Sequence, residues 1–318
     1  CIGCQVCEAN CPNGFISFEN GNVHVDDRCV HCLMCHKVSS SSCWVAESHK
    51  MPKEKGAMTT SIDHYKTLGV QYSWVKDYFD KKNAFWDDNS LGTMMLSPLK
   101  AFLADSRVSL KGKITPFGEL IATLGVDSET AWALMICNAA YTSEINWWVK
   151  NISFNRPYTP AEIVALLAED VPSEKSRKNV VSAFKNICSS NPILGERIGL
   201  GHCNSEQKGR VTHLVDITRT SWSDPNPLVI LYSLYRFAES CEGYYQFTLT
   251  TLMDASIERG GISPTEIFGL SGETMEKLLN GLSINHPEFI TCSFKMDLDS
   301  ITLRSDKTSD DVLALFEA

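Results

Sequence analysis

Hydrophobic positions recur with a helical period over most of the chain beyond residue 60. Within residues 73–82, Trp74, Val75, Tyr78 and Phe79 share one face, as the apolar stripe of an amphipathic helix does. Residues 128–141 are apolar on nearly every side, which predicts a helix buried at the centre of the fold. The same period predicts helices at 62–68, 98–104, 142–151, 228–239 and 310–316.

Two helix starts are nearly copies of each other. Thr159-Pro160-Ala161-Glu162 and Ser263-Pro264-Thr265-Glu266 each place a capping hydroxyl, a proline at the first helical position and an acid that completes a capping box. A second helix is expected after each, at 173–188 and 272–283, which gives two helix-turn-helix pairs. The likeness suggests an internal repeat. Thr115-Pro116 begins a further helix in a similar way.

Alternating apolar residues predict strands at the two ends of the chain. Residues 14–18 and 23–25 flank Asn20-Gly21, which is typical of a tight hairpin turn. Residues 289–294 and 300–303 flank a turn near Asp297, so the second helix pair is followed by a hairpin, the order of a winged helix. The glycine-bearing stretch 194–227 is expected to be a loose connection between two helical lobes.

Composition fits a folded chain that does not enter a membrane. Of the 318 residues, 43% are hydrophobic and 21% are charged. No apolar run approaches the roughly 20 residues of a membrane span, and no secretory signal opens the chain, so we expect a cytoplasmic location. The net charge of −9 argues against a whole-chain polyanion binder. Because residue 1 is a cysteine already inside a motif, we expect the chain to continue a longer protein.

Eight of the 13 cysteines lie within the first 43 residues, in two sets. The first set follows C-x2-C-x2-C-x3-C-P, the ferredoxin spacing for a [4Fe–4S] cluster, because three thiolates on a tight loop reach three irons of one cubane. The second set begins with the same spacing but places its fourth member after seven intervening residues, without a following proline. The first set is Cys1, Cys4, Cys7 and Cys11; the second is Cys29, Cys32, Cys35 and Cys43.

The fourth cysteine of each set is expected to bind the cluster of the other set. Cys43 then completes the first cluster and Cys11 the second, and all eight cysteines are metal and cofactor ligands. The alternative is zinc, but zinc ribbons use two separated C-x2-C pairs, which these triplets fit poorly. His31, His36 and His49 are further possible ligands, although such residues are more often solvated or hydrogen-bonded to cluster sulfur.

Other candidate sites have weaker signals. The helix expected from residue 173 carries four basic residues that would contact phosphates or form an ordinary solvated face: Lys175, Arg177, Lys178 and Lys185. The helix at 272–283 carries Glu273 and Glu276 with Lys277, which suits a protein contact better than DNA. No nucleotide-binding loop or zinc-protease motif is present, so no catalytic residue is assigned.

The five remaining cysteines occur singly in mostly apolar surroundings, which is typical of core positions. They are Cys137, Cys188, Cys203, Cys241 and Cys292. His202-Cys203 is the pair among them with some promise as a ligand or nucleophile.

The cysteine sets, with the turn at Cys11-Pro12-Asn13-Gly14 and the run from Arg28 to His36, resemble one family. It is the ferredoxin-like segment that follows the catalytic domain in some bacterial phosphoadenosine-phosphosulfate (PAPS) reductase-like proteins. The later part resembles a bacterial domain of unknown function, number 4007. The residues that carry the second resemblance are Leu68-Gly69-Val70, Trp74-Val75, residues 115–118, residues 142–147 and Tyr158-Thr159-Pro160.

These resemblances imply an α+β protein in four parts. Residues 1–48 would form a ferredoxin-like domain with two [4Fe–4S] clusters, and 49–60 a linker. Residues 61–200 would form the helical lobe resembling the domain of unknown function, and 201–318 a helical lobe with winged-helix-like parts. The family context is sulfur chemistry and DNA-modification or phage-defence gene clusters, with a reductase-like domain upstream as partner.

Two functions are therefore expected as alternatives. In one, the chain is an iron–sulfur electron-transfer module that forms the C-terminal part of an oxidoreductase, and its helical part docks a partner or DNA. In the other, it is a non-enzymatic protein- or DNA-binding adaptor whose clusters are structural.

Overall fold

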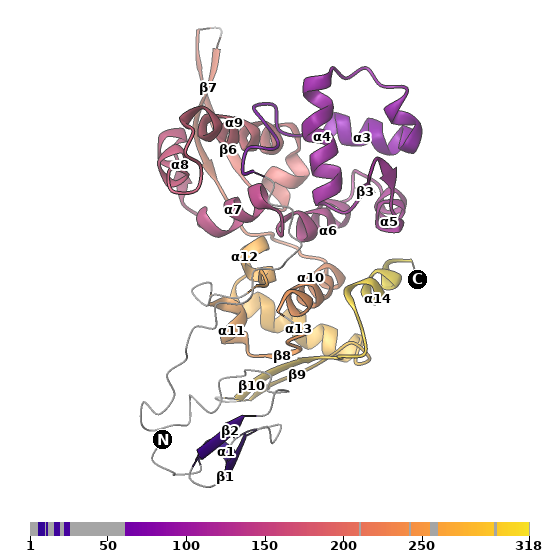
Figure 1. The fold of residues 1–318 in the computed structure, drawn as a ribbon, viewed down its shortest axis with the longest axis vertical. Coiled ribbons are helices and arrows are strands. Elements are labelled where there is room, and N and C mark those ends of the chain that lie inside the picture. Colours follow the sequence, from indigo (N-terminus) through magenta and orange to yellow (C-terminus); the bar gives the residue numbers. More distant parts are fainter. Residues whose placement is uncertain are drawn as a thin grey trace.

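The computed structural model of the chain describes residues 6–9, 11, 16–19, 22–25, 61–209, 211–241, 243–254, 260–295 and 298–317. In these residues helices are combined with small antiparallel sheets, so the chain belongs to the α+β class. Figure 1 shows the helices from α3 (Tyr72–Lys81) to α9 (Glu174–Ser190) gathered in one lobe. The helices from α10 (Pro227–Ser240) to α14 (Ser309–Leu313) form a second lobe, with α12 (Pro264–Phe268) at the junction. Within the described residues, no helix has the length and apolar character needed to cross a membrane.

The N-terminal elements are short. They are helix α1 (Val6–Ala9) and strands β1 (Ile16–Glu19) and β2 (Asn22–Val25). The two strands pair antiparallel, with Ile16 opposite Val25 and Phe18 opposite Val23. The hairpin predicted from the alternating residues is confirmed, although Asn20-Gly21 itself lies outside the described residues.

The first lobe begins with helices that the sequence predicts well. Helix α3 (Tyr72–Lys81) buries the four predicted apolar residues, and α5 (Pro116–Leu124) begins at Thr115, whose hydroxyl accepts the N–H of Gly118. Helix α6 (Glu129–Ala139) is buried along almost its whole length. The other elements here are η1 (Lys82–Trp86), α4 (Thr93–Asp105), β3 (Ser109–Leu110), β4 (Lys113–Ile114) and α7 (Ser143–Asn151).

The helix predicted at 62–68 is wrong, because this segment is a series of turns. Lys66 has φ of 54° and Gly69 has φ of 59°, and the left-handed region interrupts a right-handed helix. The backbone N–H of Tyr65 donates to Glu144 Oε2 at 3.0 Å rather than to a carbonyl one turn earlier. Tertiary contacts thus override the helical pattern of the local sequence.

The first lobe ends in a strand, two helices and a long hairpin. These elements are β5 (Pro157–Tyr158), α8 (Pro160–Leu166), α9 (Glu174–Ser190), the π turn η2 (Ile193–Arg197), β6 (His202–Lys208) and β7 (Val211–Thr218). Strand β7 lies between the other two in the order β5-β7-β6. The loose connection expected at 194–227 is therefore wrong for β6 and β7, which pair with each other. Strand β7 also pairs with β5, so this sheet spans the boundary expected at residue 200.

The second lobe repeats this order. Its sheet has the order β8-β10-β9, so the last strand is again central. Both predicted capping boxes form, since Glu162 accepts the N–H of Thr159 at 2.8 Å and Glu266 that of Ser263 at 2.9 Å. The elements are α10 (Pro227–Ser240), β8 (Gln246–Phe247), α11 (Leu249–Met253), α12 (Pro264–Phe268), α13 (Gly272–Asn285), β9 (Ile290–Lys295), β10 (Leu298–Leu303), α14 (Ser309–Leu313) and η3 (Ala314–Phe316).

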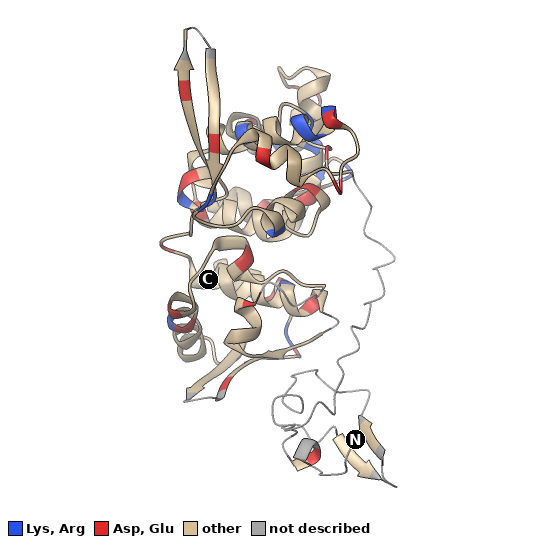
Figure 2. Ribbon diagram, turned by 90° about the vertical axis from the view of Figure 1, so that its left-hand side faces the viewer, with Lys and Arg blue, Asp and Glu red and all other residues tan. Residues whose placement is uncertain are grey.

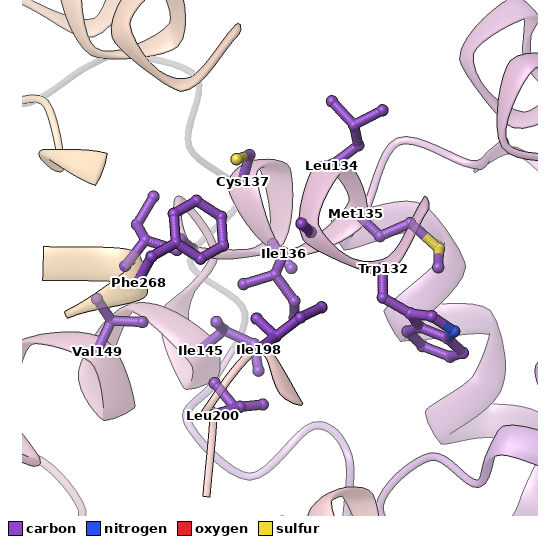
Figure 3. Close-up of a cluster of buried hydrophobic side chains, with 14 of the residues drawn as sticks. Trp132, Leu134, Met135, Ile136, Cys137, Ile145, Val149, Ile198, Leu200 and Phe268 are labelled. Atoms are coloured by element: carbon purple, nitrogen blue, oxygen red, sulfur yellow. The ribbon is translucent and has the colours of Figure 1, made fainter. Parts of the chain in front are cut away.

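A single hydrophobic core joins the two lobes. Figure 3 shows Phe268 of α12 beside Ile136 of α6 and on the same side as Ile145 and Val149 of α7. Burial of such side chains contributes roughly 1.5–3 kcal/mol each, so the lobes stabilise each other.

Arg219 forms a polar contact within this apolar junction. Its side chain is fully buried, and its guanidinium donates to the carbonyls of Val149 and Ile152 at 2.8 and 3.0 Å. It also donates to the carbonyls of Glu266 and Ile267, both at 2.9 Å. These four carbonyls lie at or near the C-terminal ends of α7 and α12, so one side chain joins the two lobes. Burial lowers the pKa of Arg219 to about 9.

Candidate functional site

Two of the eight predicted cluster ligands lie in described residues. Cys7 lies within α1, and Cys11 follows the end of this helix, with its N–H donating to Glu8 O at 3.3 Å. Because α1 ends at Ala9, Cys11 is not part of the helix that contains Cys7. The other six, Cys1, Cys4, Cys29, Cys32, Cys35 and Cys43, lie outside the described residues, as do His31, His36 and His49.

The exchange of Cys11 and Cys43 between clusters therefore stays a prediction. Within the part of the chain that the structure describes, no three His, Cys, Asp or Glu side chains are arranged to hold a metal ion. That finding covers only the described residues, which do not include six of the eight predicted ligands. The prediction of the two clusters therefore depends on the cysteine spacing.

The basic residues of α9 are only partly available to a ligand. Arg177 donates to the carbonyls of Val171 and Pro172 at 2.9 and 3.1 Å and so closes the turn before the helix. Lys178 forms an ion pair with Glu174 at 2.6 Å, and the neighbouring acid reduces the local positive charge. In Figure 2, basic and acidic segments lie beside one another along the helices of this lobe. The predicted phosphate-binding face is thus of mixed charge.

A second face of α9 is covered by residues 61–71, here called the covering segment. Thr67 donates its hydroxyl to Asn179 at 2.9 Å, and its carbonyl accepts from Asn186 at 3.1 Å. Gly69 is so close to the helix that a Cβ there would lie 2.4 Å from the carbonyl oxygen of Ala183. This face of α9 is therefore not free to enter a nucleic-acid groove.

The covering segment is held by a buried polar cluster that no motif in the sequence predicts. His64 Nε2 lies 2.5 Å from Asp105 Oδ2, and the same oxygen accepts the hydroxyl of Tyr65 at 2.5 Å. Glu144, fully buried at the start of α7, accepts the N–H of Tyr65 and lies 3.3 Å from His64 Nδ1. These residues are distant in sequence and follow no motif, so only the folded chain brings them together.

The charges of this cluster are set by burial. Burial disfavours the carboxylate and raises the pKa of Glu144 to about 8. Burial also opposes the charged form of His64, but the hydrogen bond and the charge of Asp105 outweigh it and raise the pKa of His64. The cluster therefore combines a Glu144 carboxyl whose neutral form is favoured by burial with a His64 side chain whose charged form is favoured by Asp105. It ties the covering segment to α4 and α7.

Helix α13 has the same place in the second lobe as α9 in the first, yet its outer face is open. Met275, Leu279 and Leu282 form its buried face. Glu273, Glu276 and Lys277 are exposed, and Ile284 is 78% exposed near the end of the helix. The interpretation of α13 as a surface for protein contact rather than for DNA stays a prediction.

The isolated cysteines divide into two kinds. Cys137 is fully buried, and burial raises its pKa to about 12, as it does for the half-buried Cys292. Cys203 differs, because its interaction with the thiol of Cys188 lowers its pKa. His202 lies near Glu196 at 3.6 Å, on strand β6 rather than in the expected loop.

Comparisons of the chain with protein-family models, with curated protein sequences and with solved structures find no match.

Proposed function

We propose that the chain is an iron–sulfur electron-transfer module that holds two [4Fe–4S] clusters. The observation that carries the proposal is the cysteine spacing, in which C-x2-C-x2-C occurs twice within the first 35 residues. Cys1, Cys4, Cys7 and Cys43 would hold one cluster; Cys29, Cys32, Cys35 and Cys11 would hold the other. When bound, such clusters accept and donate single electrons.

The donor set fits this group in number and kind. Two cubanes need eight ligands, and all eight are thiolates, which iron–sulfur clusters prefer over the nitrogen and oxygen donors of other metal sites. The N-terminal elements are also too short to fold by burial alone, since β1 and β2 have four residues each. Metal binding would supply folding free energy to this part of the chain.

The role of the protein's own residues is to position and insulate the clusters. The hairpin of β1 and β2 lies between the two cysteine sets in the sequence, and Ile16 is buried on one side of it. Cys11 lies beyond the end of α1, the helix that contains Cys7. The resemblance to PAPS reductase-like proteins supplies the partner, an upstream reductase-like domain that takes part in sulfur chemistry.

Iron and sulfide analysis tests this function. The full chain, purified without oxygen, is expected to contain about eight iron and eight sulfide per chain. Cys11→Ser and Cys43→Ser should each lower the iron content and the absorbance near 400 nm, and Cys241→Ser, far along the chain, should not. A chain that contains only zinc would contradict the proposal. If iron is present but dithionite leaves the cluster spectrum unchanged, the clusters are structural.

A second candidate function is a winged-helix adaptor. The repeated order of strand, helices and hairpin favours it, since each sheet has the first strand paired to the last, as in winged helices. We infer that such an adaptor would contact a protein through α13 rather than DNA through α9. The outer face of α13 is exposed and carries no cluster of basic side chains. Binding of the full chain to duplex DNA over a range of salt concentrations is expected to be absent; a steep salt dependence would restore the DNA-binding alternative.

A further inference from the structure

Two thiols meet where the end of α9 packs against the start of β6. Cys188 is 3% exposed near the C-terminus of α9, and Cys203 is half-buried on β6. The two thiols are close enough that each shifts the pKa of the other. Cys203 Sγ also lies 3.8 Å from the carbonyl oxygen of Lys185, which belongs to the turn of α9 before Cys188. The pair therefore bridges two elements that are already fixed by the fold.

Gly201 makes this approach possible. It lies two residues before Cys203, so both positions face α9, because alternate residues of an extended chain share a side. A Cβ at Gly201 would lie 2.9 Å from the sulfur of Cys188 and 2.8 Å from a methyl group of Ile217. The missing side chain leaves space for the thiol of Cys188 between the helix and the strand.

We propose that Cys188 and Cys203 form a dithiol–disulfide redox site, in which Cys203 attacks the oxidant and Cys188 resolves the product. Their positions divide these roles, since Cys203 is the thiol with access to solvent and Cys188 is covered. The charges near each sulfur support the same division. Its interaction with Cys188 and the nearby His202 and Lys185 lower the pKa of Cys203. Its interaction with Cys203 and its burial raise the pKa of Cys188.

A hydroperoxide is the class of oxidant that this arrangement fits. The thiolate of Cys203 attacks one peroxide oxygen, the O–O bond breaks, and the leaving oxygen takes a proton to become water or an alcohol. The sulfur of Cys203 then carries an S–OH group. The thiol of Cys188 attacks this sulfur, the S–S bond forms, the S–O bond breaks and a water leaves with the proton of Cys188. Two thiols lose two electrons, and the peroxide gains them.

The site is independent of the proposed clusters, since neither cysteine belongs to the two N-terminal sets. Its oxidised form would lock the end of α9 to β6. Electrons from any dithiol reductant, which itself becomes a disulfide, would restore the two thiols.

Peptide analysis of the full chain tests the proposal. Trypsin cleavage after Lys185, Arg197 and Lys208 places Cys188 and Cys203 in two neighbouring peptides, 186–197 and 198–208. After brief treatment with hydrogen peroxide and blocking of free thiols, these peptides are expected to be joined by a bond that a reductant breaks. In Cys188→Ser, a dimedone adduct should instead accumulate on Cys203. In Cys203→Ser, Cys188 should stay unmodified.

Thiol alkylation of the unoxidised full chain provides a measurement that does not depend on variants. At pH 7 Cys203 is expected to react with iodoacetamide at least tenfold faster than Cys292, a half-buried cysteine on β9 with a raised pKa. Joined peptides together with this rate difference support the site. Peroxide treatment that oxidises other cysteines but yields no joined peptides, or equal alkylation rates at Cys203 and Cys292, would overturn it.

Discussion

The two lobes end in units of the same topology, but they use the second helix of the unit differently. In the first unit, α9 carries the covering segment along one face, through Thr67, Asn179 and Asn186. In the second unit, α13 leaves its outer face in solvent, including Ile284. The sheets are equivalent, with orders β5-β7-β6 and β8-β10-β9. A shared fold therefore does not imply a shared surface role.

The difference follows from what precedes each unit. Residues 61–71 have no regular structure of their own, and several of their polar groups form hydrogen bonds to residues of α4, α7 and α9. Folding such a segment costs conformational entropy, which the buried contacts of Tyr65 and Val70 offset. The second helix of the first unit is thus covered by a preceding segment of the chain, whereas the outer face of α13 is exposed. Four changes, from the largest expected effect to the smallest, test this comparison.

Loss of the contact between the lobes should have the largest effect. Arg219→Met removes the donors of four buried carbonyls, and we expect it to lower the free energy of unfolding by about 3–5 kcal/mol. Arg304→Met is the control: Arg304 is exposed and pairs with Asp306 at 3.3 Å, so its loss should cost less than about 0.5 kcal/mol. Urea unfolding of the full chain, followed by circular dichroism, measures both. Equal effects would mean that the two units do not depend on their junction.

The covering segment should make stability depend on pH. The pKa of Glu144 is about 8 in the folded chain and near 4.5 when unfolded, so the folded state keeps a proton that the unfolded state releases. This stabilisation is complete below about pH 4.5 and is lost as pH rises towards 8; the raised pKa of His64 acts in the same direction. We expect Glu144→Gln to remove about 3 kcal/mol of pH dependence between pH 5 and 8.5.

Urea unfolding of wild type and Glu144→Gln at several pH values measures that difference. Parallel stability profiles for the two proteins would contradict the assigned protonation of Glu144.

Truncation of one isoleucine on each helix compares their buried and open faces. Ile187 on α9 is 2% exposed, and Ile284 on α13 is 78% exposed. Ile187→Ala should cost about 2–3 kcal/mol, because it leaves a cavity between α9 and its neighbours. Ile284→Ala should change the free energy of unfolding by less than about 0.5 kcal/mol. A large loss at Ile284 would mean that the outer face of α13 is covered.

Alanine at two glycines should give effects of opposite sign. Gly69→Ala places a Cβ against the carbonyl of Ala183 at a positive φ, and we expect a loss of about 2 kcal/mol. Gly281→Ala lies in α13 with no atom within 4 Å of the added Cβ, and should stabilise by about 0.5–1 kcal/mol through helix propensity. Thermal unfolding of the full chain compares them. A stabilising Gly69→Ala would show that the covering segment is loosely held.

The predictions made from sequence succeeded where a local signal was strong. The buried face of α3, the capped starts of α5, α8 and α12 and the N-terminal hairpin all depend on residues within one or two turns of each other. The repeat suggested by the two capping boxes corresponds to two sheets of equal strand order. The prediction failed at 62–68, where the helical pattern was overridden, and at 202–218, where glycines concealed two strands.

The candidate sites divide in the same way. The cluster ligands rest on spacing alone, which the sequence states in full, and their geometry stays a prediction for the residues outside the described ranges. The basic face of α9 looked available in the sequence, but Arg177 binds carbonyls and Lys178 pairs with Glu174. No pattern could have indicated the cluster of His64 with Asp105 and Glu144.

The amino-acid sequence by itself determined the cysteine sets, the capped helices and the paired strands, because each depends on neighbours along the chain. Only the tertiary structure decided which helix face is covered, which cysteines meet and where Arg219 is buried. Those outcomes join residues such as Thr67 and Asn179, 112 positions apart, whose distance is set by packing of the whole core. Packing free energy is a sum over many contacts, so no short stretch of sequence records it.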